Sequence, residues 1–165
     1  MPDFVRPSYA ATVISPEFQT IGQIEPIGPW LDYLNAKDKY TLPLKNARFM
    51  PIGAAAGNTP EKPQVFVNRV DVCFIYLPDR AAHQSVNMLR NVQIAIAHIG
   101  PIICRAEFHM GVDATLLTFM DDLAGNFFPV TNADLHAKLA LPVPLPNKAD
   151  LLLVNRLHVQ VYHPA

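Results

Sequence analysis

The sequence predicts an all-β protein that contains two duplicated β-units and few short helical turns. Residues 66–74 (FVNRVDVCF) return near the C-terminus as residues 153–161 (LVNRLHVQV), so that Asn68 and Arg69 recur as Asn155 and Arg156. The apolar positions around both pairs recur in the same phase. The 16 prolines are spread over the whole chain, which disfavours long helices and favours short strands and turns.

The composition indicates a surface that is partly covered by a partner. Charged residues make up 16% of the 165 residues and hydrophobic ones 50%, whereas about 25% of an average globular protein is charged. A net charge of -1 gives no overall attraction to nucleic acid or to an anionic membrane. Because no apolar run approaches the roughly 18 residues that span a bilayer and no signal peptide is recognisable, we expect no membrane insertion and a cytoplasmic location. Cys73 and Cys104 are expected to be buried thiols.

The first unit is expected at residues 11–79, after an irregular N-terminal arm at residues 1–10. Residues 11–24 read as extended, with a bulge or bend at Gly22, and Trp30 opens one helical turn. Residues 40–50 alternate, and 53–63 form a long loop. Alternation then predicts one strand over 65–76, whose core face carries Phe66, Val70, Val72, Phe74 and Tyr76.

The second unit is expected at residues 91–165, after a polar connector at residues 80–90. In this half Gly111 matches Gly22, Phe119 matches Trp30, and residues 127–130 match 41–44. A unit of about 75 residues has a thin core, so the two should pack together. We expect two small β-barrel or roll units related by a pseudo-twofold, or one continuous sheet built from both.

The order of residues in the first half resembles the Sm and Sm-like family of small β-barrels. Residues 21–24 (IGQI), Asp32, Asn35 and the alternating stretch from Leu42 to Ala47 follow the family's first motif, and residues 66–70 (FVNRV) are similar to its second. No glycine follows Arg69 or Arg156, unlike in the family. The resemblance implies a barrel topology and binding of RNA. Residues 31–35 and 43–47 also resemble uncharacterised bacterial proteins, which bring no assigned activity.

The sequence predicts no catalytic, cofactor-binding or metal-binding residues and hence no enzyme. None of the six histidines forms a metal-binding pair on a predicted helix. The adjacent Asp121 and Asp122 point apart and suit helix capping, and Cys73 has no predicted base beside it. The alternative is a small-ligand-binding domain or an enzyme, with an apolar pocket between the halves near Trp30 and Phe119.

We expect an assembly or scaffolding module that binds itself as a homo-oligomer or joins a protein complex. The proline-spaced run 141–146 suits an extended form that a neighbouring chain could cover. Candidate interaction residues are Phe4, Leu141, Val143 and Leu145. The alternative is an Sm-like RNA-binding protein, for which the candidate contacts are basic residues with one aromatic among them: Lys37, Lys39, Tyr40, Arg69 and Arg156.

Overall fold

The chain is mainly β, with few and short helices, as the sequence predicted. The computed structural model describes residues 5–53 and 59–165. Within these ranges, no helix is long and apolar enough to cross a membrane. The first half contains β1 (Tyr9–Ile14), β2 (Phe18–Ile24), α1 (Trp30–Leu34), β3 (Thr41–Pro51), β4 (Lys62–Asn68), the 3-10 turn η1 (Arg69–Asp71) and β5 (Phe74–Tyr76).

The second half repeats this succession of elements after a short helix in the connector, α2 (Arg80–His83). It contains β6 (Asn91–Ile99), β7 (Ile102–Met110), α3 (Leu116–Phe119), β8 (Phe127–Ala137), β9 (Lys148–Asn155), the 3-10 turn η2 (Arg156–His158) and β10 (Val159–Pro164). The segment predicted as an irregular arm reaches into β1, which begins at Tyr9.

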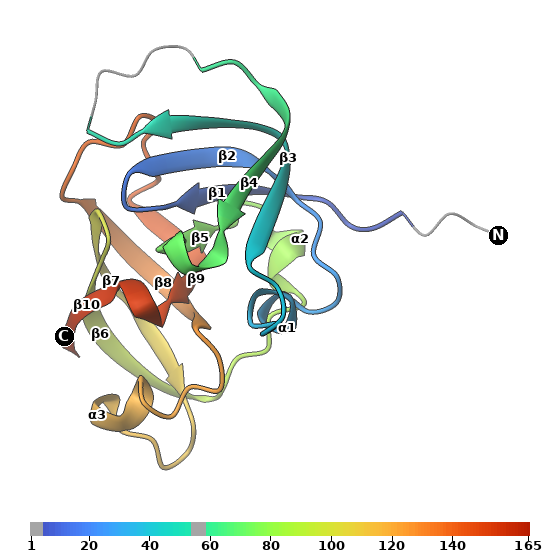
Figure 1. The fold of residues 1–165 in the computed structure, drawn as a ribbon. Helices are drawn as coiled ribbons and strands as arrows, with labels where there is room; N and C mark the ends of the chain where they lie inside the picture. The colour runs from blue at the N-terminus through green and yellow to red at the C-terminus, as the bar shows by residue number, and fades with distance from the viewer. Residues whose placement is uncertain (1–4, 54–58) are drawn as a thin grey trace.

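All ten strands form one antiparallel sheet in the order β10-β6-β7-β8-β9-β5-β1-β2-β3-β4 (Figure 1). Among the described strands, β4 and β10 lie at the two ends of this order and do not pair with each other, so the sheet is open. Hydrogen bonding therefore does not close either half into the predicted barrel. The alternative expectation, one continuous sheet built from both halves, is what the chain forms.

The two halves have the same strand order, β5-β1-β2-β3-β4 in one and β10-β6-β7-β8-β9 in the other. Their registers agree as well. Thr41 lies opposite Asn68 on the β3–β4 ladder, and Phe127 lies opposite Asn155 on the β8–β9 ladder. Each residue that is paired in the ladders of one half can thus be assigned a counterpart in the other half from its register.

A bulge recurs at the same place in both halves. The register shifts between β2 and β3 and between β7 and β8, close to Asn46 and Asn132, which both adopt positive φ, 46° and 48°. Gly22 lies at the first bulge, where an added Cβ would meet the Cβ of Ala47 at 2.5 Å. Ala106, not Gly111, takes the place of Gly22 in the second ladder, because Gly111 follows the end of β7.

The predicted strand over residues 65–76 is wrong, because the chain makes the 3-10 turn η1 in the middle of it. This turn changes the alternation phase, so Phe66 and Val70, which were assigned to the core, are 63% and 59% exposed. Val72 and Phe74, which follow the turn, are buried. The turn carries the chain from the outer strand β4 across to β5, which pairs with β1.

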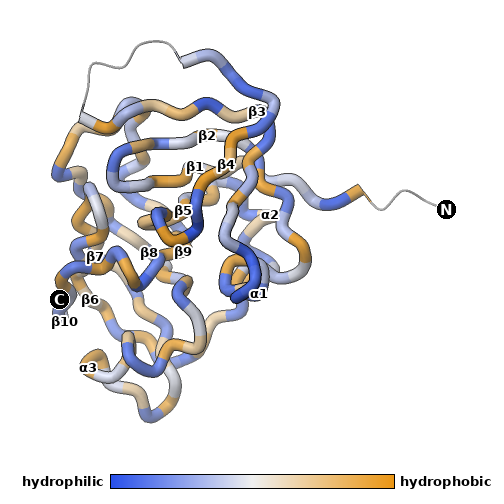
Figure 2. The backbone as a smooth tube through the Cα atoms, viewed as in Figure 1, coloured by the Kyte–Doolittle hydropathy of each residue, from blue (hydrophilic) through white to orange (hydrophobic). Residues whose placement is uncertain are grey.

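Two hydrophobic clusters form the core, and each contains residues of both halves. The larger cluster consists mainly of second-half side chains but includes Ile14, Cys73 and Phe74. The smaller one consists mainly of first-half side chains but includes Phe127 and Leu153. In Figure 2 the tube is orange, which marks hydrophobic residues, along parts of β4 and of β5. Burial thus runs across the junction between the halves.

Candidate functional site

The junction between the halves is a short antiparallel ladder between β9 and β5. Its register places Phe74 opposite Val154, Ile75 opposite Leu153 and Tyr76 opposite Leu152. All of these side chains except the partly exposed Tyr76 are buried. Within the second half β9 is the last strand on the β8 side, whereas within the first half β5 is the last strand on the β1 side. The junction therefore joins two unlike edges.

The repeated asparagine reinforces the junction in one half only. Asn155 is buried, its side-chain amide donates to the carbonyl oxygen of Arg69 at 3.4 Å, and its backbone N–H donates to that of Cys73 at 3.0 Å. Asn68, its counterpart at the end of β4, is exposed. The same residue type therefore bridges the two halves at β9 and faces solvent at β4.

The face of the first half that meets the second half carries a pair of fully buried apolar side chains, Ile14 and Phe74. These residues lie opposite each other on the β1–β5 ladder. They belong to the larger core cluster, whose second-half members include Ile102, Cys104, Leu135, Leu152 and Val154. The second half thus supplies an apolar surface that covers this pair.

Two amide side chains tie loops across the junction. Asn35 donates to the carbonyl oxygen of Phe127 at 3.1 Å and accepts from its backbone N–H at 2.8 Å. Gln19, which is fully buried, forms the same two-way contact with the backbone of Val143, at 2.8 Å and 2.9 Å. In each case the side-chain amide forms hydrogen bonds with both the backbone N–H and the backbone C=O of one residue, so both of these groups are satisfied as they would be in a sheet.

The candidate interaction segment thus contacts the other half of its own chain. Leu141 and Leu145 are partly buried against the larger core cluster, and Gln19 holds Val143 between them. Phe4, the remaining candidate, lies outside the described residues. The prediction that these residues contact a second chain stays a prediction, but the segment already has an acceptor within the same chain.

The strands at the two ends of the sheet expose apolar side chains where the junction buries them. Phe66 on β4 and Val161 on β10 are 63% and 56% exposed. Their counterparts at the junction, Leu153 and Phe74, are fully buried. An edge strand presents unpaired N–H and C=O groups, and apolar side chains beside them favour pairing with another strand. The sequence reasoning expected strand edges that can pair with neighbours, but it assigned Phe66 to the core and named no residue of either edge strand as exposed.

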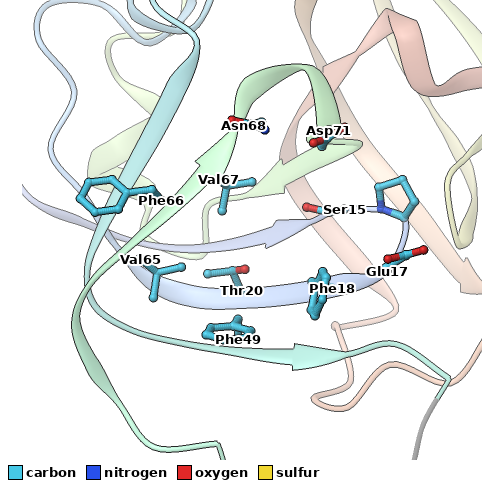
Figure 3. A pocket seen from close by; sticks show the side chains of 11 residues that line it. Ser15, Glu17, Phe18, Thr20, Phe49, Val65, Phe66, Val67, Asn68 and Asp71 are labelled. Atoms are coloured by element: carbon cyan, nitrogen blue, oxygen red, sulfur yellow. The ribbon is translucent and has the colours of Figure 1, made fainter.

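A pocket of about 580 Å³ opens beside β4 on the inner side of the first half (Figure 3). Phe18 and Phe49 meet in it with their rings 5.9 Å apart in an edge-on arrangement. Glu17 and Asp71 are the acidic residues of the lining. The strands β2, β3 and β4 contribute Phe18, Thr20, Phe49, Val65, Phe66 and Val67 to the lining, and Pro16 adds a further apolar residue.

The five candidate RNA contacts converge. Lys37, Lys39, Tyr40, Arg69 and Arg156 all line one depression of about 660 Å³ at the junction of the halves. Lys37, Lys39 and Tyr40 are close in sequence, whereas Arg69 and Arg156 lie far from them and from each other along the chain.

Both arginines of this depression are engaged by backbone carbonyl groups. Arg69 is buried, donates to the carbonyl oxygens of Tyr33 and Thr41, and lies 4.7 Å from the centre of the Tyr33 ring. Burial lowers the pKa of Arg69, an effect that Tyr33 opposes. Arg156 donates in the same manner to the carbonyl oxygens of Met120 and Leu123 at 3.0 Å and 3.2 Å. Each arginine thus fastens the helical turn of its own half to the 3-10 turn.

One hydrogen-bonded chain of polar side chains joins His109 to Thr131 at 2.7 Å and Thr131 to Glu107 at 3.0 Å in the part of the chain that the structure describes. No group of three or more His, Cys, Asp or Glu side chains there could hold a metal ion. Burial raises the pKa of Cys73 and of Cys104 to about 12, so both thiols stay protonated near neutral pH. Trp30 and Phe119, between which an apolar pocket was expected, belong to different core clusters.

No family model, curated protein or solved structure matches the chain.

Proposed function

We propose that this protein is a non-enzymatic assembly module whose copies join head to tail, with β4 of one copy pairing along β10 of the next. The observation that carries the proposal is the internal pairing of β9 with β5. Because both halves have the same strand order, β9 is the counterpart of β4 and β5 is the counterpart of β10. The chain thus presents at its two ends the same edges that it pairs internally.

The matching registers support a duplication of one β-unit, related head to tail. A twofold axis joins like edges, so that residue i of one unit meets residue j of the other and the reverse holds as well. The junction joins unlike edges, so we replace the predicted pseudo-twofold by a head-to-tail relation. Such a contact leaves one free edge at each end of a complex, and assembly continues until a ring closes or a filament grows.

Burial supports self-association through these edges. The edge residues Phe66 and Val161 are exposed in the single chain, although their counterparts are fully buried at the junction. The strong bias toward hydrophobic residues, 50% against 16% charged, leaves few charges to protect an edge. Each head-to-tail contact removes the β4 edge of one copy and the β10 edge of the next from water.

Light scattering on the purified protein at tens of micromolar tests this function. We expect the wild-type chain to have a mass above that of a monomer. Phe66→Lys should shift it toward monomer, because a lysine on an edge strand opposes pairing. Val112→Lys, at a site 90% exposed and outside both edges, is the matched control and should change nothing. A wild-type chain that is monomeric at these concentrations would contradict the proposal.

Binding of single-stranded RNA is the second candidate, favoured by the convergence of Lys37, Lys39 and Tyr40 in one depression. Tyr40 is 79% exposed and could stack on a base. Against it, Arg69 and Arg156 donate to backbone carbonyl groups, and Asn35 bonds the backbone of Phe127. Of the five candidate contacts, Lys37, Lys39 and Tyr40 remain to contact RNA.

Fluorescence anisotropy with a short labelled single-stranded RNA distinguishes the two candidates. We expect no binding of the RNA, and hence no rise in anisotropy, at moderate ionic strength. Few positively charged side chains in the depression are left to contact phosphates. If RNA is bound at micromolar concentrations, if the affinity falls with added salt and if it also falls in Lys39→Ala, the RNA candidate is the better one.

A further inference from the structure

We propose that the pocket beside β4 is the acceptor for two side chains of a second copy, His98 and Val161. This inference rests on the proposed head-to-tail function and adds to it the residues that enter the pocket.

The donor pair is identified by register. Phe74 lies opposite Ile14 on the β5–β1 ladder, and Val161 lies opposite His98 on the β10–β6 ladder. The next pairs agree, because Ile75 lies opposite Val13 where Tyr162 lies opposite Ala97. His98 and Val161 are therefore the counterparts of Ile14 and Phe74.

The acceptor surface is identified in the same way. Cys104 lies opposite Leu135 in the second half, and Thr20 lies opposite Phe49 in the first. Ile102 opens β7 as Phe18 opens β2. Leu152 and Val154 on β9 correspond to Val65 and Val67 on β4. Five second-half members of the cluster that contains Ile14 and Phe74 thus have counterparts that line the pocket: Phe18, Thr20, Phe49, Val65 and Val67.

Burial distinguishes the occupied surface from the open one. Ile102 and Leu135 are 1% and 6% exposed, whereas their counterparts Phe18 and Phe49 are 40% and 38% exposed. The first half contributes Ile14, Cys73 and Phe74 to the cluster that contains Ile102 and Leu135, and Leu141 and Leu145 of the second half pack against the same cluster. The open pocket therefore has the position and the apolar lining that the internal junction uses to bury a pair of side chains.

The junction also fixes the register between copies. Transferring the β5–β9 pairs to β10 and β4 places Val161 opposite Val67, Tyr162 opposite Phe66 and His163 opposite Val65. In this register the side chain of Asn68 is placed to donate to the partner copy as Asn155 donates to Arg69.

Restoring the internal pair at the donor edge is the test. The double change His98→Ile with Val161→Phe recreates Ile14 and Phe74, and added apolar burial should lower the dissociation constant between copies about tenfold. Val161→Asp should raise it at least about 100-fold, because a carboxylate would enter an apolar pocket. Val112→Phe, an exposed valine outside both edges, should leave it unchanged. Sedimentation over a concentration series measures all four proteins.

A cross-link tests the register separately. Val67→Cys with Val161→Cys should give disulfide-linked multimers on mild oxidation, whereas Phe66→Cys with Val161→Cys, one residue out of register, should give far fewer. If Phe66→Lys dissociates the assembly and the cross-link between positions 67 and 161 forms, but the double change His98→Ile with Val161→Phe leaves the dissociation constant unchanged, the pocket is not the acceptor although the proposed function stands. If the wild-type chain does not associate, the proposed function itself fails.

Discussion

Replacing Gly100 by alanine is expected to lower the free energy of unfolding by about 2 to 5 kcal/mol. Gly100 has φ of 51°, a left-handed conformation that costs an alanine roughly 1–2 kcal/mol. An added Cβ would also lie 2.7 Å from the Sγ atom of Cys73 across the junction, and overpacking of this kind typically costs about 1–3 kcal/mol. Urea unfolding at one fixed protein concentration measures the change.

Gly28 provides the matched control, because it separates the two causes. Its φ is 76° and a Cβ there would meet nothing within 4 Å, so Gly28→Ala should cost only the conformational part. The double variant Gly100→Ala with Cys73→Ala removes the sulfur that the new methyl group would meet, and should recover part of the loss. Equal costs at Gly28 and Gly100, with no coupling to Cys73, would show that the junction is not tightly packed at this point.

The repeated Asn-Arg pair led from the sequence to the mainly β fold and to the comparison of the halves. It did not reveal the 3-10 turn that begins at Arg69. Alternation was therefore followed through the turn, and Phe66 and Val70 were assigned to the core. Predicting a break in phase between Phe66 and Phe74 requires knowing the pairing partner of the part before the turn and that of the part after it. Those partners are residues far away in the chain.

The candidate site was predicted less well, for a related reason. Strand alternation marks apolar side chains but cannot tell a face that packs inside the chain from an edge that stays open, as Leu153 and Phe66 illustrate. The sequence resemblance did bring Lys37 and Arg69 into one group. It could not show that the Arg69 guanidinium donates to the carbonyl oxygens of Tyr33 and Thr41, since those contacts depend on how the 3-10 turn η1 packs.

Mixing two edge variants tests the head-to-tail assembly most directly. Phe66→Lys blocks the β4 edge and leaves β10 intact, whereas Val161→Asp blocks the β10 edge and leaves β4 intact. If copies join through unlike edges, each variant alone has no complementary pair of edges and should be monomeric. In a mixture, β10 of the first variant can pair with β4 of the second, and assembly must stop there because both outer edges are blocked.

Light scattering combined with size-exclusion chromatography should therefore show monomers for each variant alone and a discrete one-to-one dimer for the mixture. The double variant, with both changes in one chain, should stay monomeric when mixed with itself and serves as the control. A wild-type assembly in which Val161→Asp alone still forms dimers through β4, with no new species on mixing, would mean that like edges pair and would contradict the head-to-tail relation.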